Sequence, residues 1–153
     1  MIDGSKMPFA LEITYNAPLP ANAATTPISL STALSHAQVA EGEPVEMRAT
    51  ITVAENNVPT PVAIIGIPAG LVVRHDQLKE LIGTDSISAY EVRDSELVFY
   101  WRALKAGETR IVPISLTAEI PGTYTAPASR IYPYYTDEQK LWQGGHSIEI
   151  VAR

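Results

Sequence analysis

The clearest alternation in the chain runs from residue 45 to residue 53 and reads Val45-Glu46-Met47-Arg48-Ala49-Thr50-Ile51-Thr52-Val53. Apolar residues take every odd position of this stretch, and polar or charged residues take every even one. Because successive side chains of a β-strand point to opposite faces of the sheet, the stretch can bury one face and expose the other. It therefore predicts a strand that directs its aliphatic side chains into a core.

Similar strands are expected on both sides of this stretch. Further alternating runs occur at 9–15, 28–34, 112–120 and 148–150. The runs 62–65 and 97–101 are apolar throughout, which is typical of strands that are covered on both faces. Turn-forming residues separate the runs at 41–44, 55–57, 93–95, 105–108 and 121–122. About nine or ten short strands at this spacing predict an all-β fold, an antiparallel β-sandwich.

One segment has helical spacing instead. Leu78, Leu81 and Ile82 recur at the spacing of one helix face between Asp76 and Gly83. Asp76 is the expected N-cap and Gly83 the expected stop. A helix this short is unstable alone, so packing of its apolar residues on a sheet must hold it. The sequence thus predicts a sandwich with one short amphipathic helix.

The composition restricts the classes of partner. The chain has 153 residues, no cysteine and a formal net charge of −6. The length suits one domain, and the lack of cysteine excludes disulfides and cysteine-based zinc sites. The acidic balance argues against nucleic acid and anionic membranes, and no apolar run is long enough for membrane insertion. Residues 1–7 do not resemble a signal peptide, which leaves a cytoplasmic protein or a piece of a longer exported chain.

Catalytic motifs are missing from the sequence. No nucleophile elbow of the Gly-x-Ser-x-Gly type occurs, and the glycine-containing stretch 66–70 lacks the Lys and Ser/Thr of a phosphate loop, so it predicts a turn. His36, His75 and His146 are far apart, without the spacing of metal ligands. The adjacent acids at 137–138 suit a turn better than a general acid and base pair. We predict no enzymatic activity and no cofactor or metal.

Aromatic residues gather near the end of the chain, at Tyr132, Tyr134, Tyr135 and Trp142. Tyrosine and tryptophan are enriched at binding surfaces, and their rings also stack over sugars. Tyrosines near strand ends of a β-sandwich more often pack at the core edge and donate one hydrogen bond. The pattern favours core-edge packing for this cluster, and Trp101, within an apolar run, is expected in the core.

Two elements in a fixed order suggest a family. The first is Gly66-Ile67-Pro68-Ala69-Gly70-Leu71, which ends an apolar run and is followed by the predicted helix. The second is Tyr134-Tyr135-Thr136-Asp137-Glu138. With strands at 90–101 and the stretch 120–130 between them, residues 25–153 resemble the C-terminal receptor-binding domain of the alpha-2-macroglobulin family. The residues of these motifs and the lack of cysteine resemble bacterial members of the family more than animal ones.

The resemblance implies a domain at the C-terminal end of a large extracellular or periplasmic protease inhibitor, a thioester protease trap. In that family the thioester lies in another domain, and the C-terminal domain is a non-catalytic module for protein interaction. The implied partners are other domains of the same parent chain and a protein receptor. Residues 1–24 would then be a strand of the preceding domain and a linker, and residues 25–153 the interaction domain.

The resemblance also implies a set of partner-binding residues. Animal members bind their receptor through two lysines one turn apart on the helix, and only one lysine is kept at the matching positions here. The residues Tyr134 to Glu138 belong to the family's signature element. The candidate partner-binding residues are therefore His75, Lys79, Tyr134, Tyr135, Asp137 and Glu138.

A second hypothesis stays open beside this one. The tyrosines and tryptophan between residues 132 and 142 are also compatible with a free-standing adhesive or carbohydrate-binding β-sandwich. The gene context of the segment and binding to glycans would distinguish the two hypotheses.

Overall fold

The structure is a computed structural model that describes residues 19–153. The strand predicted at 9–15, and most of the predicted segment 1–24, lie outside the described residues. Residues 19–27 form no helix or strand, yet they are bonded to the domain. The Ala23 amide donates to the Lys140 carbonyl at 3.0 Å, and Asn22 Oδ1 accepts the Trp142 amide at 2.6 Å.

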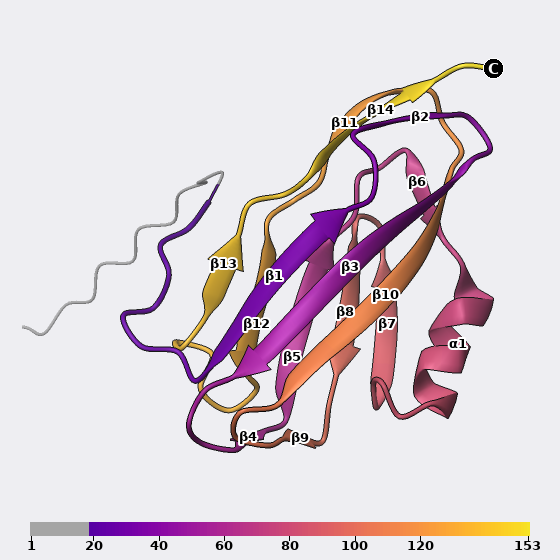
Figure 1. Ribbon diagram of the computed structural model, residues 1–153. Coiled ribbons are helices and arrows are strands. Elements are labelled where there is room, and N and C mark those ends of the chain that lie inside the picture. Colours follow the sequence, from indigo (N-terminus) through magenta and orange to yellow (C-terminus); the bar gives the residue numbers. More distant parts are fainter. Residues whose placement is uncertain (1–18) are drawn as a thin grey trace, which may run out of the picture.

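The described residues form two large sheets that lie face to face (Figure 1). The four-stranded sheet has the order β1 (Ile28–Leu34), β3 (Pro44–Val53), β10 (Thr109–Ala118) and β6 (Leu71–Val73). The five-stranded sheet has the order β13 (Leu141–Gln143), β12 (Ser129–Pro133), β5 (Pro61–Gly66), β8 (Glu96–Tyr100) and β7 (Ala89–Arg93). All pairs within these two sheets are antiparallel, which confirms the predicted sandwich.

Two smaller sheets lie at the ends of the sandwich (Figure 1). One has the order β11 (Gly122–Thr125), β14 (Ser147–Val151) and β2 (Gln38–Ala40), and the other pairs β4 (Val58–Pro59) with β9 (Ala103–Leu104). The strand β14 pairs with β2 in parallel, unlike the strands of the two large sheets. Helix α1 (His75–Gly83) follows β6.

The core lies between the two large sheets and follows the predicted alternation. The odd-numbered residues of β3 from Val45 to Val53 are at most 2% exposed. The even-numbered residues of β10 from Val112 to Ala118 are fully buried. Ile120 is an exception to the predicted run, because it is 55% exposed. The chain turns after Ala118, where the Glu119 and Ile120 amides both donate to the Gly70 carbonyl.

Strand β5 is buried on both faces, as its apolar sequence predicts. Ala63 and Ile65 belong to the core between the sheets. Val62 and Ile64 lie on the opposite, outer face, where they form a second buried cluster with Val98. The outer face of the five-stranded sheet is therefore covered by side chains of the domain itself.

The helix packs on the sandwich through its leucines, as predicted. Leu78 and Leu81 are buried, and α1 contacts β10. Ile82 was expected on the same face but is 43% exposed. A single short helix against the edge of the sandwich buries only a narrow stripe, and residue 82 is rotated out of it.

Both predicted ends of the helix need correction. Arg74, not Asp76, is the N-cap, and its side chain makes no capping hydrogen bond. The Arg74 amide donates to Ser115 on β10, so the chain stays extended up to this residue and the helix begins directly after it. Gly83 is the last helical residue rather than the stop. Thr84 ends the helix, with its amide at 2.9 Å and its hydroxyl at 3.1 Å from the Glu80 carbonyl oxygen.

A side-chain amide covers part of the free edge of β1. The Thr32 amide donates to Gln143 Oε1 at 2.8 Å, and Gln143 Nε2 donates to the Thr32 carbonyl at 3.2 Å. The glutamine thus imitates the backbone of a neighbouring strand. His146 Nε2 lies 2.9 Å from the Thr32 hydroxyl and joins the same group. These bonds connect the edges of the two large sheets on this side of the sandwich.

The pair Gly144 and Gly145 offers a test of this packing. A Cβ on Gly145 would overlap the Ala126 carbonyl, whereas a Cβ on Gly144 would meet no atom within 4 Å. Neither glycine has a positive φ, so packing alone distinguishes them. We expect Gly145→Ala to lower the free energy of unfolding by about 2 kcal/mol or more, since backbone must shift. Gly144→Ala should change it by less than about 0.5 kcal/mol in the same urea titration.

Candidate interaction surface

The outer face of the five-stranded sheet carries aromatic and charged side chains in two cross-strand rows. The first row, in the order of the strands from β13 to β7, is Trp142, Arg130, Ile64, Val98 and Glu91. The second row, from β12 to β7, is Tyr132, Val62, Tyr100 and Ala89. Neighbours in a row lie directly opposite each other, so their side chains pack together. The aliphatic members Val62, Ile64 and Val98 are buried, Ala89 at the sheet edge is exposed, and the aromatic and charged members surround the buried cluster.

Two cations contact the aromatic rings at the β12–β13 side of this face. The Arg130 guanidinium lies 5.3 Å from the Trp142 ring centroid and forms two bonds to Glu96, at 2.6 and 3.3 Å. Lys140 Nζ lies 4.8 Å from the Tyr132 ring and 5.9 Å from the Trp142 ring. Such cation–π contacts hold the rings in place.

Two tyrosines project from the turn between β12 and β13, which we call the tyrosine turn (residues 134–140). Tyr134 is 56% exposed and Tyr135 is 80% exposed. Their rings meet edge to face, with centroids 5.3 Å apart. The expectation of core-edge packing is therefore wrong for these two residues, whereas Tyr132 does pack against the outer cluster. The difference arises because Tyr134 and Tyr135 follow the end of β12, where no neighbouring strand covers them.

Backbone hydrogen bonds fix the tyrosine turn. The Tyr134 amide donates to the Thr60 carbonyl at 3.0 Å, and the Thr136 and Gln139 amides close two successive turns. Asp137 and Glu138 are exposed on these turns, as predicted for an acidic pair outside a strand. Asp137 Oδ2 lies 3.7 Å from Lys140 Nζ. The turn thus presents two aromatic rings beside two carboxylates.

The six predicted partner-binding residues fall into two separate groups. His75 and Lys79 are exposed on α1, which packs on β10 in the four-stranded sheet. The other four residues lie in the tyrosine turn, next to β13 at the far end of the five-stranded sheet from β7 (Figure 1). The structure does not bring the groups together, and their role in binding stays a prediction.

A third polar group lies on β7 and β8 and was missed in the sequence. The Tyr100 hydroxyl donates to Glu91 Oε1 at 2.7 Å, and Arg93 donates to Glu91 Oε2 at 2.9 Å. The Tyr100 hydrogen bond, followed by the Arg93 hydrogen bond, lowers the pKa of Glu91. Burial, and then the bond to Glu91, raise the pKa of Tyr100 to about 12. Glu91 and Arg93 are two residues apart in a strand, so the sequence alone could have predicted that their side chains lie on the same face and form an ion pair.

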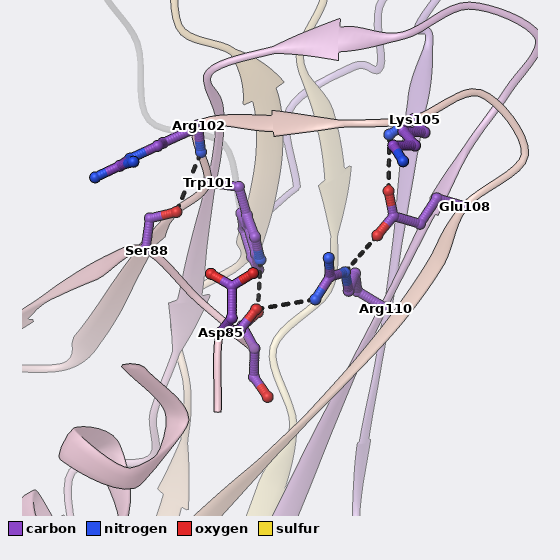
Figure 2. A network of polar contacts seen from close by, with 8 residues as sticks. Asp85, Ser88, Trp101, Arg102, Lys105, Glu108 and Arg110 are labelled. Atoms are coloured by element: carbon purple, nitrogen blue, oxygen red, sulfur yellow. Dashed lines mark hydrogen bonds and ion pairs between the residues drawn. The ribbon is translucent and has the colours of Figure 1, made fainter. Parts of the chain in front are cut away.

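A polar network ties the segment after α1 to the sheets (Figure 2). The Trp101 indole, buried as predicted, donates to the Ser86 carbonyl at 2.7 Å. Arg110 donates to the Asp85 carbonyl at 2.9 Å and also pairs with Glu108. The Lys105 amide, more than Arg110, lowers the pKa of Glu108. These bonds hold the segment after α1 and the turn at 105–108 in place, because three of them join a side chain to a backbone group.

Two further kinds of feature are absent from residues 19–153. Within that range, no three His, Asp or Glu side chains are arranged to hold a metal ion. No helix in the same range is long and apolar enough to cross a membrane.

Two face-to-face antiparallel sheets with one helix at the edge define a β-sandwich domain. A family model described as the bacterial alpha-2-macroglobulin MG10 domain matches residues 19–138. Because the match covers most of the chain, the chain belongs to this family. No protein with a curated description matches the chain.

Solved structures of bacterial alpha-2-macroglobulins share the fold. Trypsin-activated alpha-2-macroglobulin from Escherichia coli matches 89% of this chain with a TM-score of 0.71 and 18% identity. A native Escherichia coli fragment that spans domain MG7 to the C-terminus matches 88% with a TM-score of 0.68 and 19% identity. A mutant alpha-2-macroglobulin from Salmonella matches 86% with a TM-score of 0.70 and 17% identity. The chain spans 11%, 24% and 10% of these three chains respectively.

The bond between Tyr100 and Glu91 makes a testable prediction for alkaline pH. Because the pKa of Tyr100 is raised in the folded state, folded protein holds this proton more tightly than unfolded protein between pH 10 and about pH 12. The stabilisation is complete below pH 10 and is lost as the pH rises through that window. We expect Glu91→Gln to lower the pKa of Tyr100 only partly, since burial remains. Phenolate absorbance during a pH titration measures this shift, and Tyr100→Phe identifies the signal.

Proposed function

We propose that this domain is a non-catalytic protein-interaction domain at the C-terminal end of an alpha-2-macroglobulin-like protease inhibitor. Membership of the bacterial alpha-2-macroglobulin MG10 family supports the link to such a protein. A fragment that spans domain MG7 to the C-terminus of its own protein shares the fold, and the late position in the parent chain is part of the proposal. We also propose that the parent chain is exported, to the periplasm or the cell exterior.

The tyrosine turn is the main observation behind the interaction proposal. Exposed rings at 56% and 80% add little to the stability of the domain that carries them. Tyrosine contributes large contact area at low entropy cost, and it is among the residues enriched in binding hot spots. The hydrogen bonds of the turn hold the backbone that carries both rings before any partner arrives, which lowers the cost of ordering on binding.

The chemistry of the turn specifies the kind of surface that it fits. Two rings at right angles require an apolar hollow, and Asp137 and Glu138 beside them favour basic groups at its rim. We propose that another domain of the same parent chain provides this surface. We further propose that His75 and Lys79 on α1 form a second, smaller group that contacts a different domain or a receptor.

Carbohydrate binding has less support as the main function. A sugar site on the outer face would use the open face of Trp142, and that ring already contacts Arg130 and Lys140. The exposed rings of the tyrosine turn lie edge to face rather than forming one flat platform.

A binding titration tests the proposed function. The domain would be titrated into the remainder of the parent chain, produced separately, by calorimetry. We expect the double variant Tyr134→Ser/Tyr135→Ser to bind at least about tenfold more weakly than the unchanged domain, because both anchors are lost. Its thermal midpoint should be unchanged, since both side chains are exposed.

Ile120→Ser is the matched control, because Ile120 is 55% exposed and lies outside the turn. This control should bind like the unchanged domain. Equal affinity of the double tyrosine variant would contradict the role of the turn. Binding to a glycan array that requires Tyr134 would favour the adhesive alternative.

A further inference from the structure

The outer edge of β7 is a second candidate surface, separate from the tyrosine turn. Strand β7 is the last strand of the five-stranded sheet, and every residue except Tyr90 is exposed. At the opposite end of the sheet, Asn22 and Ala23 bond to the β13 region, and Gln143 covers the edge of β1. The edge of β7 has no such cover among residues 19–153. An uncovered edge strand can pair with another chain.

The register shows which backbone groups are available on this edge. The Trp101 amide donates to the first carbonyl of β5, so odd-numbered residues of β8 bond toward β5. The even-numbered residues of β8 (96–100) therefore bond toward β7, where their partners are the odd-numbered residues 89–93. The N–H and C=O groups of Tyr90 and Val92 then point to the open edge.

The side chains of β7 form a self-complementary pattern. Glu91, Val92 and Arg93 place an acid and a base on one face, with an aliphatic residue between them on the other. If two copies of β7 pair antiparallel about Val92, Glu91 of each copy lies opposite Arg93 of the other. Both pairs then join opposite charges at the closer, non-hydrogen-bonded positions of the ladder.

Only one of the two nearest symmetric registers has this property. Pairing about Glu91 also satisfies the free groups of Tyr90 and Val92, but it places Glu91 directly opposite Glu91 of the second copy. Like charges directly opposite each other destabilise a strand pair. The charges therefore select the register about Val92.

Val92 also borders a cleft at this edge. It faces the same side of the sheet as Leu97 yet is 42% exposed. The cleft, of about 240 Å³, lies between β6 and β7, and its lining combines apolar residues such as Leu71 and Leu97 with the polar residues His75, Arg93, Asp94 and Glu96. A second Val92 next to the first would cover the apolar part of this cleft, which adds a small hydrophobic contribution to the backbone pairing.

From these observations we infer that β7 is a homodimerisation edge, at which two copies of this chain pair antiparallel about Val92. The resulting ten-stranded sheet would be continuous through the two-fold axis. The interface is small, so the dimer should be weak and reversible, with a dissociation constant on the order of 10⁻⁴ M. This inference does not depend on the tyrosine turn or on a parent chain.

Charge exchange tests the pairing with the 153-residue chain itself. Glu91→Arg alone and Arg93→Glu alone each place like charges opposite one another, so each variant should dimerise at least about tenfold more weakly. An equimolar mixture of the two variants restores opposite charges in both pairs and should form a heterodimer. Sedimentation equilibrium over a range of concentrations measures all three samples, and circular dichroism checks that each variant is folded.

The pair Glu46 and Arg48 provides the matched control. These residues have the same spacing and a similar ion pair of 3.0 Å, but they lie in β3, which has neighbours on both sides. Glu46→Arg and Arg48→Glu should leave dimerisation unchanged. In hydrogen exchange, the Tyr90 and Val92 amides should gain protection as concentration rises, whereas the Glu91 and Arg93 amides should be protected already.

Three results would overturn the inference. The unchanged chain could remain monomeric at concentrations well above the expected dissociation constant. A dimer could form that neither Glu91→Arg nor Arg93→Glu weakens, which would place the contact on another surface. The mixture of the two variants could remain monomeric, which would contradict the register about Val92.

Discussion

The burial of β5 on both faces is the constraint on which the arrangement of this domain depends. One face of β5 supplies the core between the sheets. The other face carries Val62 and Ile64, which together with Val98 would be exposed to solvent if no other side chains covered the outside of the sheet. Full burial of such a side chain is worth about 1.5–3 kcal/mol. Leaving these three side chains in water would therefore cost several kcal/mol, a large share of the net stability of a domain.

The outer rows of the five-stranded sheet meet this requirement. Tyr100 and Tyr132 pack over the aliphatic cluster, and Arg130 and Lys140 add their aliphatic stems around the rings. The ion pair and the cation–π contacts among them contribute on the order of 1 kcal/mol each, at a site where the Arg130 and Glu96 side chains are 20% and 21% exposed. The hydrophobic cover therefore dominates, and the charges mainly fix the orientation of the side chains. This face is consequently a completed surface, whereas the tyrosine turn keeps exposed rings and the β7 edge keeps open backbone groups.

The strands could be predicted from the sequence because a period of two reports directly on which side of a sheet is buried. The position of the helix could be predicted, but its first residue could not. The helix begins where the hydrogen bond from the Arg74 amide to the Ser115 carbonyl ends the extended chain, and these two residues are far apart in the sequence. The exposure of Tyr134 and Tyr135 depends on where β12 ends relative to its neighbours, and local composition does not report this. Tyr132 and Tyr134 are two apart and chemically identical, yet one covers a cluster and the other meets solvent.

The Glu-x-Arg pattern also shows that a motif can be found in the sequence while its role depends on the topology of the sheet. It occurs three times, as Glu46 and Arg48, Glu91 and Arg93, and Glu108 and Arg110, and each forms an ion pair between residues two apart. In β3 the strands β1 and β10 on either side already occupy the backbone, so the pair can act only within its own strand. Glu108 lies in the turn before β10, and Glu108 and Arg110 bond to the Lys105 amide and the Asp85 carbonyl of the same domain. In β7 one side is open, and the same two charges become complementary to a second copy of themselves. The motif is present in the sequence, but its meaning depends on which strand the fold leaves at the edge, and that is decided by pairings between residues distant in the chain.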